Sequence, residues 1–210
     1  MIVTPALYCA GEDLIRRLDA FVKRGGVLVS SFRSFVSDEQ ASVYPDAQPH
    51  GLTACFGMTY NQFTEPGRAM IKGEKIQYFM ELMKPESAGR EAGYEHPYWG
   101  EYAGITRNAY GNGAAWYVGC FTEKELLKEV YQKAAKDAKI PLPAYTWPVT
   151  IRSGRTKEGA DLHYVLHYSQ EERDITCPWD LAEDVLTGKS YRRDDRIHLK
   201  DWDVLILREK

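Results

Sequence analysis

The first thirty residues place one segment of helical periodicity between two short apolar runs. The runs are residues 2–7 and 27–29. Between them, apolar residues recur three and four positions apart from Leu14 to Val22, which predicts a helix with one buried face. The pair Gly25-Gly26 favours its end, because glycine adopts a positive φ without steric cost. A strand, a helix and a second strand joined by short turns are typical of a parallel sheet, so the pattern predicts an α/β fold.

The next part of the chain shows less periodicity. Residues 30–66 are rich in proline and glycine, which predicts mostly loop with one short helix at residues 52–56. Strands are predicted at residues 69–71 and 76–83. Residues 84–101, which mix glutamate, glycine and aromatic residues, are expected to form a polar connection.

A β-hairpin and a helix are predicted next. Residues 105–110 and 114–118 are strand-like runs around an Asn-Gly turn, whose two central residues tolerate a positive φ. Thr122 is a predicted helix N-cap, and Glu125, three residues later, completes a capping box. The apolar positions that follow predict a helix as far as Ala138.

A domain boundary is expected near residues 140–147, where Pro141 and Pro143 end the helix. The periodicity then becomes strand-like, so we expect an α/β domain at residues 1–143 and a small all-β domain at residues 144–210. The predicted strands of the second domain are residues 149–152, 161–168, 174–177, 184–186, 196–199 and 203–207. Their short spacing predicts a small antiparallel β-sandwich.

Size and charge exclude several classes of protein. The 210 residues are 44% hydrophobic, enough for a core, but they are too few for a (β/α)8 barrel of about 250 residues. The formal net charge of -3 offers no basic surface for nucleic-acid phosphates. No uncharged apolar run reaches the roughly 18 residues of a membrane span, and no signal sequence follows Met1. We therefore expect a cytoplasmic protein that binds neither nucleic acid nor membranes.

The cysteines and histidines offer one candidate nucleophile. Cys9 lies between a predicted strand and helix, where α/β enzymes often place a nucleophile, but its neighbours Tyr8 and Ala10 favour a packed cysteine. A base for Cys9 would have to be one of the five histidines, none of which lies in a recognisable motif: His50, His96, His163, His167 and His198. His163 and His167 share one face of a predicted strand, which favours exposed or hydrogen-bonded histidines over metal ligands. No metal ion and no cofactor are expected.

Residues 94–102 concentrate aromatic side chains. They contain four rings that look exposed, together with two glutamates. Such rings stack on a sugar or seal a protein interface, and a loop folded on its own aromatic residues is the structural alternative. A carbohydrate-binding module that uses this segment therefore stays open as a hypothesis.

Three stretches share the pattern of a known family. They are residues 2–29, residues 106–119, and a terminal segment with Trp179-Asp180, Leu186-Thr187-Gly188 and residues 203–207. Taken in order, they resemble the C-terminal part of glycoside hydrolase family 42, the bacterial β-galactosidases. The first two are similar to that family's trimerisation domain and the third to its small C-terminal β domain.

The resemblance implies a fold, an assembly and a role. The fold is α/β, with a partial three-layer, doubly wound domain of the class I glutamine amidotransferase-like type before the small β-sandwich. Self-association is expected, because the family forms trimers. The family's two catalytic glutamates lie on a (β/α)8 barrel, and its first strands have no counterpart before Ile2. We therefore assign no catalytic residue, and a galactoside substrate is expected only through the absent barrel.

One loop of the resembled domain suggests an interface. Residues 34–39 are similar to the family's Ser-Gly-x-x-Asp/Asn-Glu segment, with Phe35 where glycine is usual. In the family's trimers, loops of the α/β domain approach a neighbour's catalytic cleft. The residues expected near such an interface or cleft are Phe32, Arg33, Phe35, Asp38 and Glu39.

The implied function is a non-catalytic oligomerisation and accessory portion of a β-galactosidase, which hydrolyses terminal β-D-galactosides. The alternatives are a small amidotransferase-like enzyme with Cys9 as nucleophile and the carbohydrate-binding module.

Overall fold

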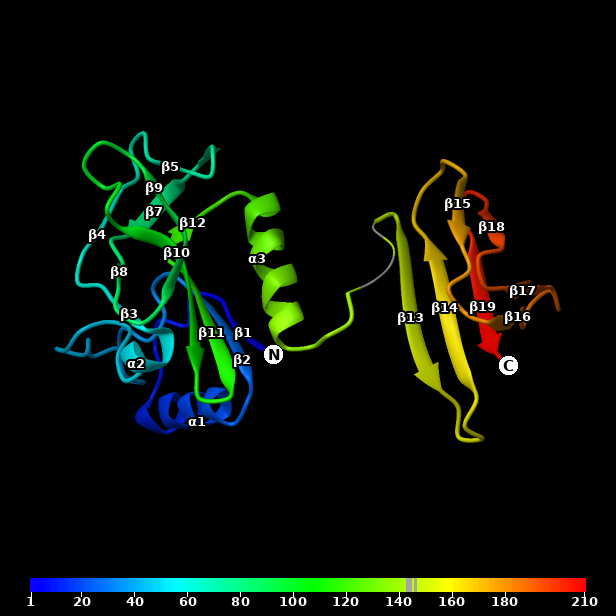
Figure 1. Ribbon diagram of the computed structural model, residues 1–210, viewed down its shortest axis with the longest axis horizontal. Helices are drawn as coiled ribbons and strands as arrows, with labels where there is room; N and C mark the ends of the chain where they lie inside the picture. Colours follow the sequence, from blue (N-terminus) through cyan, green and yellow to red (C-terminus); the bar gives the residue numbers. More distant parts are fainter. Residues whose placement is uncertain (143–144, 146) are drawn as a thin grey trace. The chain divides into compact units, whose positions relative to one another are not determined.

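The computed structural model describes residues 1–142, 145 and 147–210, which form two compact units, Met1–Leu142 and Pro143–Lys210 (Figure 1). The boundary expected between residues 143 and 144 falls on residues outside this description.

The helices lie in the first unit: α1 (Glu12–Lys23), α2 (Thr53–Phe56) and α3 (Lys124–Asp137). The strands of the first unit are β1 (Ile2–Thr4), β2 (Val27–Ser31), β3 (Met58–Thr59), β4 (Phe63–Thr64), β5 (Met70–Ile71), β6 (Glu74–Lys75), β7 (Gln77–Glu81), β8 (Lys84–Pro85), β9 (Gly89–Glu95), β10 (Ala103–Tyr110), β11 (Gly113–Val118) and β12 (Cys120–Phe121).

The described residues are mostly β-structure arranged in several sheets. The largest is a seven-stranded sheet in the order β1-β2-β11-β10-β9-β5-β6. β1, β2 and β11 are parallel to one another, and the predicted strand, helix and strand are β1, α1 and β2. β10, β9, β5 and β6 continue the sheet with antiparallel pairings. The first unit therefore contains a mixed sheet of parallel and antiparallel strands, with more strands than the predicted α/β fold.

The two longer helices lie on opposite faces of the parallel strands, because both faces of these strands are apolar. α3 shares one core cluster with the first face, which comprises Val27, Val29, Ala114, Trp116 and Val118. α1 shares another with the second face, which comprises Leu28, Ala115 and Tyr117. Side chains alternate between the faces of a strand, so these uninterrupted apolar runs bury both sides of the sheet.

The β-hairpin is confirmed, but its turn differs from the prediction. Tyr110 pairs with Gly113, so the central residues are Gly111 and Asn112 rather than an Asn-Gly pair. Gly111 has a φ of +58°, and a β-carbon at Gly113 would lie 2.1 Å from the carbonyl oxygen of Gly26. Both positions therefore require glycine, because the tip of the hairpin packs tightly against the end of α1.

The expected polar connection at residues 84–101 is wrong, since it contains β9, which pairs with β10. Glycines and charged residues conceal the strand in the sequence. Only Ala92 and Tyr94 within it are buried, so its apolar alternation is too short to recognise.

The predicted capping box of α3 is also wrong. Glu123 occupies the N-cap position without a side-chain hydrogen bond. The Thr122 hydroxyl oxygen is buried and has no partner among the described residues. The helix starts one residue later than the capping box requires.

The second unit consists of antiparallel strands around one core. Its strands are β13 (Val149–Arg155), β14 (Asp161–His167), β15 (Arg173–Thr176), β16 (Leu181–Asp184), β17 (Ser190–Arg192), β18 (Arg196–Leu199) and β19 (Val204–Glu209). A five-stranded sheet has the order β13-β14-β19-β16-β17, and β15 pairs with β18. Both sheets contribute to the same cluster of buried residues. The strand expected at residues 184–186 is wrong, because β16 ends at Asp184, where Gly188 N–H donates to the Asp184 carbonyl to close a turn.

None of the helices in the described part of the chain is long and apolar enough to cross a membrane.

Candidate functional site

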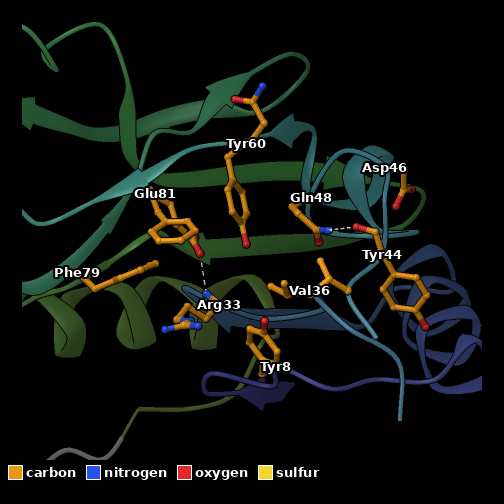
Figure 2. Close-up of a pocket in the computed structure, with 12 residues that line it drawn as sticks. Tyr8, Arg33, Val36, Tyr44, Asp46, Gln48, Tyr60, Phe79 and Glu81 are labelled. Carbon is orange, nitrogen blue, oxygen red and sulfur yellow. Dashed lines mark hydrogen bonds between the residues drawn. The ribbon is translucent and has the colours of Figure 1, made fainter. Parts of the chain in front are cut away.

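A pocket of about 330 Å³ lies beside the carboxyl ends of the parallel strands. Tyr8 follows β1, Arg33 follows β2, and Glu81 is the last residue of β7. Parallel strands place the segments that follow them at the same edge of the sheet, where α/β proteins commonly bind ligands. The lining residues are Tyr8, Arg33, Val36, Val43, Tyr44, Asp46, Gln48, Tyr60, Asn61, Phe63, Phe79 and Glu81 (Figure 2).

The Glu81 carboxyl is the most deeply buried charged group of the pocket, with 1% of the residue exposed. Its Oε1 accepts a hydrogen bond of 2.7 Å from the Arg33 backbone N–H. Burial raises the pKa of Glu81 to about 7, although this bond, the nearby Tyr60 and Tyr117 hydroxyls and the Arg33 charge favour the ionised form. Within the described residues, Glu81 Oε2 and both tyrosine hydroxyls form no hydrogen bond of regular geometry, although the three groups lie close together.

Arg33 is held at the mouth of the pocket. Its φ of +57° is a left-handed conformation, which the bond from its N–H to Glu81 helps to hold. Its guanidinium carbon lies 5.2 Å from the centre of the Tyr8 ring and 5.3 Å from that of Phe79. These cation–π contacts keep the exposed charge over the aromatic wall of the pocket.

An exposed aromatic patch adjoins the pocket. We define it as Phe32, Phe63, Tyr78, Phe79 and Phe121. The ring centres of Phe32 and Phe79 are 5.5 Å apart, those of Phe63 and Phe79 5.1 Å, and those of Tyr78 and Phe121 5.2 Å. Tyr78 is 76% exposed and Phe63 is 63% exposed. Phe32 and Phe79 are partly buried between these exposed rings. Contiguous surface aromatic rings are typical of interaction surfaces, because water contact with them is unfavourable.

The structure separates the five residues expected near an interface. Phe32 belongs to the aromatic patch and Arg33 lines the pocket. Phe35 is fully buried, so its side chain does not lie on the surface as expected. Asp38 accepts hydrogen bonds from the backbone N–H groups of residues 40 and 42, at 2.9 and 2.8 Å, and thus stabilises its own loop. Glu39 is exposed. Their relation to a neighbour's cleft stays a prediction.

Phe35 also explains the departure from glycine in its segment. Its φ is +63°, a conformation that glycine adopts at low cost. Its ring packs 6.2 Å from that of Phe56, centre to centre, within the core beside α1. Burial of a large side chain therefore accompanies backbone strain at this position.

Cys9 is exposed, contrary to the packed cysteine expected. The Ser37 hydroxyl donates to its sulfur at 3.2 Å. Each histidine forms a hydrogen bond with a group other than Cys9. The pairs are His50 with Asp46, His96 with the Tyr98 N–H, His163 with Ser153, His167 with the Lys200 carbonyl, and His198 with Asp174. In the described residues, these hydrogen bonds bring no base to Cys9.

His163 and His167 are buried. Both ring nitrogens of His163 have hydrogen-bond partners, Ser153 and Glu209, whereas His167 Nε2 has none among the described residues. No group of three or more His, Cys, Asp or Glu residues in the described ranges is placed to hold a metal ion.

The aromatic segment at residues 94–102 folds largely on itself. Tyr94 is 3% exposed, against expectation, and its hydroxyl donates to the Glu81 carbonyl at 2.8 Å. Trp99 and Tyr102 pack against the core, and His96 stacks on Trp99. Tyr98 is 78% exposed. Sugar binding by this segment stays a prediction, with Tyr98 as its most exposed ring.

Analysis of the sequence missed Glu81 and Tyr60. The available signal was one charged residue within the otherwise apolar and aromatic run at residues 78–83. A buried charge on a strand often marks a functional group, because burial without a partner is unfavourable.

Comparison with known families gives one assignment for most of the first unit. Residues 1–141 match the family described as the β-galactosidase trimerisation domain. The match covers two thirds of the 210 residues.

Curated relatives and solved structures agree with this match. The β-galactosidase LacA of Lactobacillus acidophilus is 27% identical over 220 residues, which cover 99% of this chain and 32% of the relative. The β-galactosidase GalA of Bacillus licheniformis is 24% identical over 199 residues, which cover 90% of this chain and 29% of the relative. The chain thus spans about a third of the length of these relatives.

The folds of two solved structures are similar to that of this chain. The β-galactosidase from Bacillus circulans sp. alkalophilus has a TM-score of 0.87 at 22% identity, covering 99% of this chain and 32% of that one. The polyextremophilic β-galactosidase from the haloarchaeon Halorubrum lacusprofundi has a TM-score of 0.72 at 23% identity, covering 98% of this chain and 30% of that one.

Proposed function

The chain belongs to the β-galactosidase trimerisation domain family, and from this premise we infer that it is a non-catalytic assembly and accessory portion of a glycoside hydrolase family 42 β-galactosidase. The family match over residues 1–141 is the observation that carries this proposal. Glycoside hydrolysis requires two carboxyl groups at a fixed separation across one bond. We assign that pair, and the terminal β-D-galactoside substrate, to the rest of the parent enzyme.

The aromatic patch is the proposed contact surface for self-association. Its rings Phe63, Tyr78 and Phe121 are large and exposed, and aromatic residues are enriched in protein interfaces. A cyclic trimer needs two different surfaces that bind each other, so the patch forms one half of each contact. Homo-oligomerisation in the cytoplasm is part of this proposal.

Sedimentation velocity over a range of protein concentrations tests the proposal. We expect a species with three times the monomer mass, and we expect Tyr78→Ser combined with Phe121→Ser to shift it towards the monomer. Both side chains are exposed, so the double variant should keep the fold. Tyr98→Ser, which changes an exposed tyrosine of the same unit outside the patch, is the matched control.

Two results would contradict the proposal. A monomer at the highest concentration would refute self-association of this chain. An undisturbed trimer in the double variant would refute the aromatic patch as its contact surface.

The finer fold assignment also belongs to this proposal. We assign residues 1–143 to a partial three-layer, doubly wound domain of the class I glutamine amidotransferase-like type, and residues 144–210 to a small antiparallel β-sandwich. The positions of α1 and α3 on opposite faces of β2 and β11 support the first assignment. The common core of the two antiparallel sheets supports the second.

A further inference from the structure

His50 lies between two carboxylates that come from different segments of the first unit. Its Nε2 is 2.8 Å from Glu12 Oε1, at the start of α1, and its Nδ1 is 2.7 Å from Asp46 Oδ1. An ionised carboxylate accepts hydrogen bonds and donates none, so both ring nitrogens must carry a proton for both contacts to be hydrogen bonds. The arrangement therefore selects the positively charged imidazolium form of His50.

The surroundings of His50 hold its ring in place. The ring stacks on that of Tyr44, with centres 3.6 Å apart and planes 12° apart. The His50 backbone N–H donates to the Phe35 carbonyl at 3.2 Å, and the Tyr44 hydroxyl donates to the Ala10 carbonyl at 2.9 Å. These contacts oppose rotation of the ring, so a change in its charge acts on the two carboxylates.

Negative charge surrounds this histidine. The charged groups that act on it are Glu12 from α1 and Asp46 from its own segment. Asp38 and Glu39 add negative charge beside the tyrosine stacked on it. Partial burial lowers the pKa of His50, but the hydrogen bonds to the two carboxylates outweigh this effect and raise the pKa above 6.5. The charged form therefore persists to a higher pH than in an unfolded chain.

We propose that His50 is a pH-sensitive clamp, which holds the loop of residues 36–50 on the first turn of α1 by binding Glu12 and Asp46 at the same time. Loss of one proton to water leaves a single N–H donor on the ring, so one carboxylate then faces a nitrogen lone pair and is repelled. The stabilisation is fully present below pH 6.5 and is lost as the pH rises through the pKa of the folded state.

The clamp acts on one wall of the pocket of about 330 Å³. Tyr44, Asp46 and Gln48 line the pocket from this loop, and Figure 2 shows them on the side opposite Phe79. Loosening of the loop therefore makes access to the pocket depend on pH. The residues of the aromatic patch lie outside residues 36–50, so the clamp is a device separate from the surface proposed for self-association.

NMR spectroscopy of the full chain tests the clamp. The His50 ring should titrate with a midpoint above pH 6.5. In Glu12→Gln the midpoint should fall by about 0.5–1 unit, because one of the two carboxylates is gone. Glu12 is exposed, so this variant keeps the fold and decides the proposal even where replacement of His50 disturbs the loop.

Hydrogen exchange measures the consequence for the loop. The Tyr44 N–H donates to the Val36 carbonyl at 3.0 Å and reports whether the loop is closed. Its protection factor should fall by about 5- to 10-fold between pH 5.5 and pH 8.5, which is the loss of one hydrogen bond to a charged group. His50→Gln keeps Glu81 and its titration but removes the imidazole, so its protection should change much less over this range.

His198→Gln is the matched control. His198 also lies between two carboxylates, with Nδ1 3.0 Å from Asp174 and Nε2 3.4 Å from Glu172, but it belongs to the second unit. Its replacement should leave the exchange of the Tyr44 N–H as in the unmodified protein. A His50 midpoint at or below pH 6.5, an unchanged midpoint in Glu12→Gln, or equal loss of protection in His50→Gln would overturn the proposal.

Discussion

Replacing Glu81 with glutamine should change how the stability of the first unit depends on pH. Burial raises the pKa of Glu81 from 4.5 to about 7, so the folded state favours the neutral carboxylic acid. Above pH 4.5 the unfolded chain has released this proton, whereas the folded chain retains it until the pH passes about 7. The contribution of the protonated Glu81 carboxyl to stability is therefore fully present below pH 4.5 and is lost as the pH rises through 7. Glutamine does not titrate, and its oxygen can still accept the bond from the Arg33 N–H.

The magnitude follows from the two pKa values. Each unit of difference between the folded and unfolded pKa values corresponds to about 1.4 kcal/mol, so the full change in the free energy of unfolding is roughly 3 kcal/mol. About 2.5 kcal/mol of it falls between pH 5 and pH 8. The free energy of unfolding of Glu81→Gln should therefore lose about 2.5 kcal/mol less than that of the unmodified protein over this range.

Urea unfolding at several values between pH 5 and pH 8 measures this difference. Hydrogen exchange in β2 and β11 restricts the readout to the first unit, because both are internal strands of its seven-stranded sheet. Glu39→Gln, at an exposed glutamate, is the control that removes one charge without altering the buried site. Parallel stability curves for Glu81→Gln and the unmodified protein would refute a buried carboxyl that titrates near neutral pH.

Two further predictions concern Phe35 and the cysteines. Phe35→Gly should lower the free energy of unfolding by about 2–4 kcal/mol, because loss of the buried ring outweighs relief of the positive φ. Urea unfolding measures this change. Equal or higher stability of the variant would show that backbone strain dominates. Iodoacetamide should modify Cys9 alone in the native protein, because Cys55, Cys120 and Cys177 are buried and burial raises their pKa values. Mass spectrometry identifies the modified residue, and comparable labelling of a buried cysteine would contradict the burial seen here.

Elements with strong local patterns were predictable from the sequence. The apolar spacing from Leu14 to Val22 gives α1, and the strand-like runs around Gly111 give the hairpin. In these segments the residues that determine the structure are close together in the chain. β9 and the start of α3 were not predictable in this way, because the pairing of β9 with β10 and the burial of the Thr122 hydroxyl oxygen depend on tertiary contacts.

The site was less predictable than the fold. The burial of Glu81 depends on Arg33 and Tyr60, which lie 48 and 21 positions away in the sequence. The burial of Phe35 depends on a left-handed backbone conformation that no local residue type demands. Resemblance to a family drew attention to residues 32–39, but it did not separate Arg33 at the pocket from Phe35 in the core.

The parallel pairing of β2 with β11 also affects how the chain matures during biosynthesis. β1, α1 and β2 leave the ribosome before β11, so Val27 meets its partner Ala114 only after the residues between them have been translated. Until then, one edge of β2 and its apolar faces are open to other nascent chains, which favours aggregation.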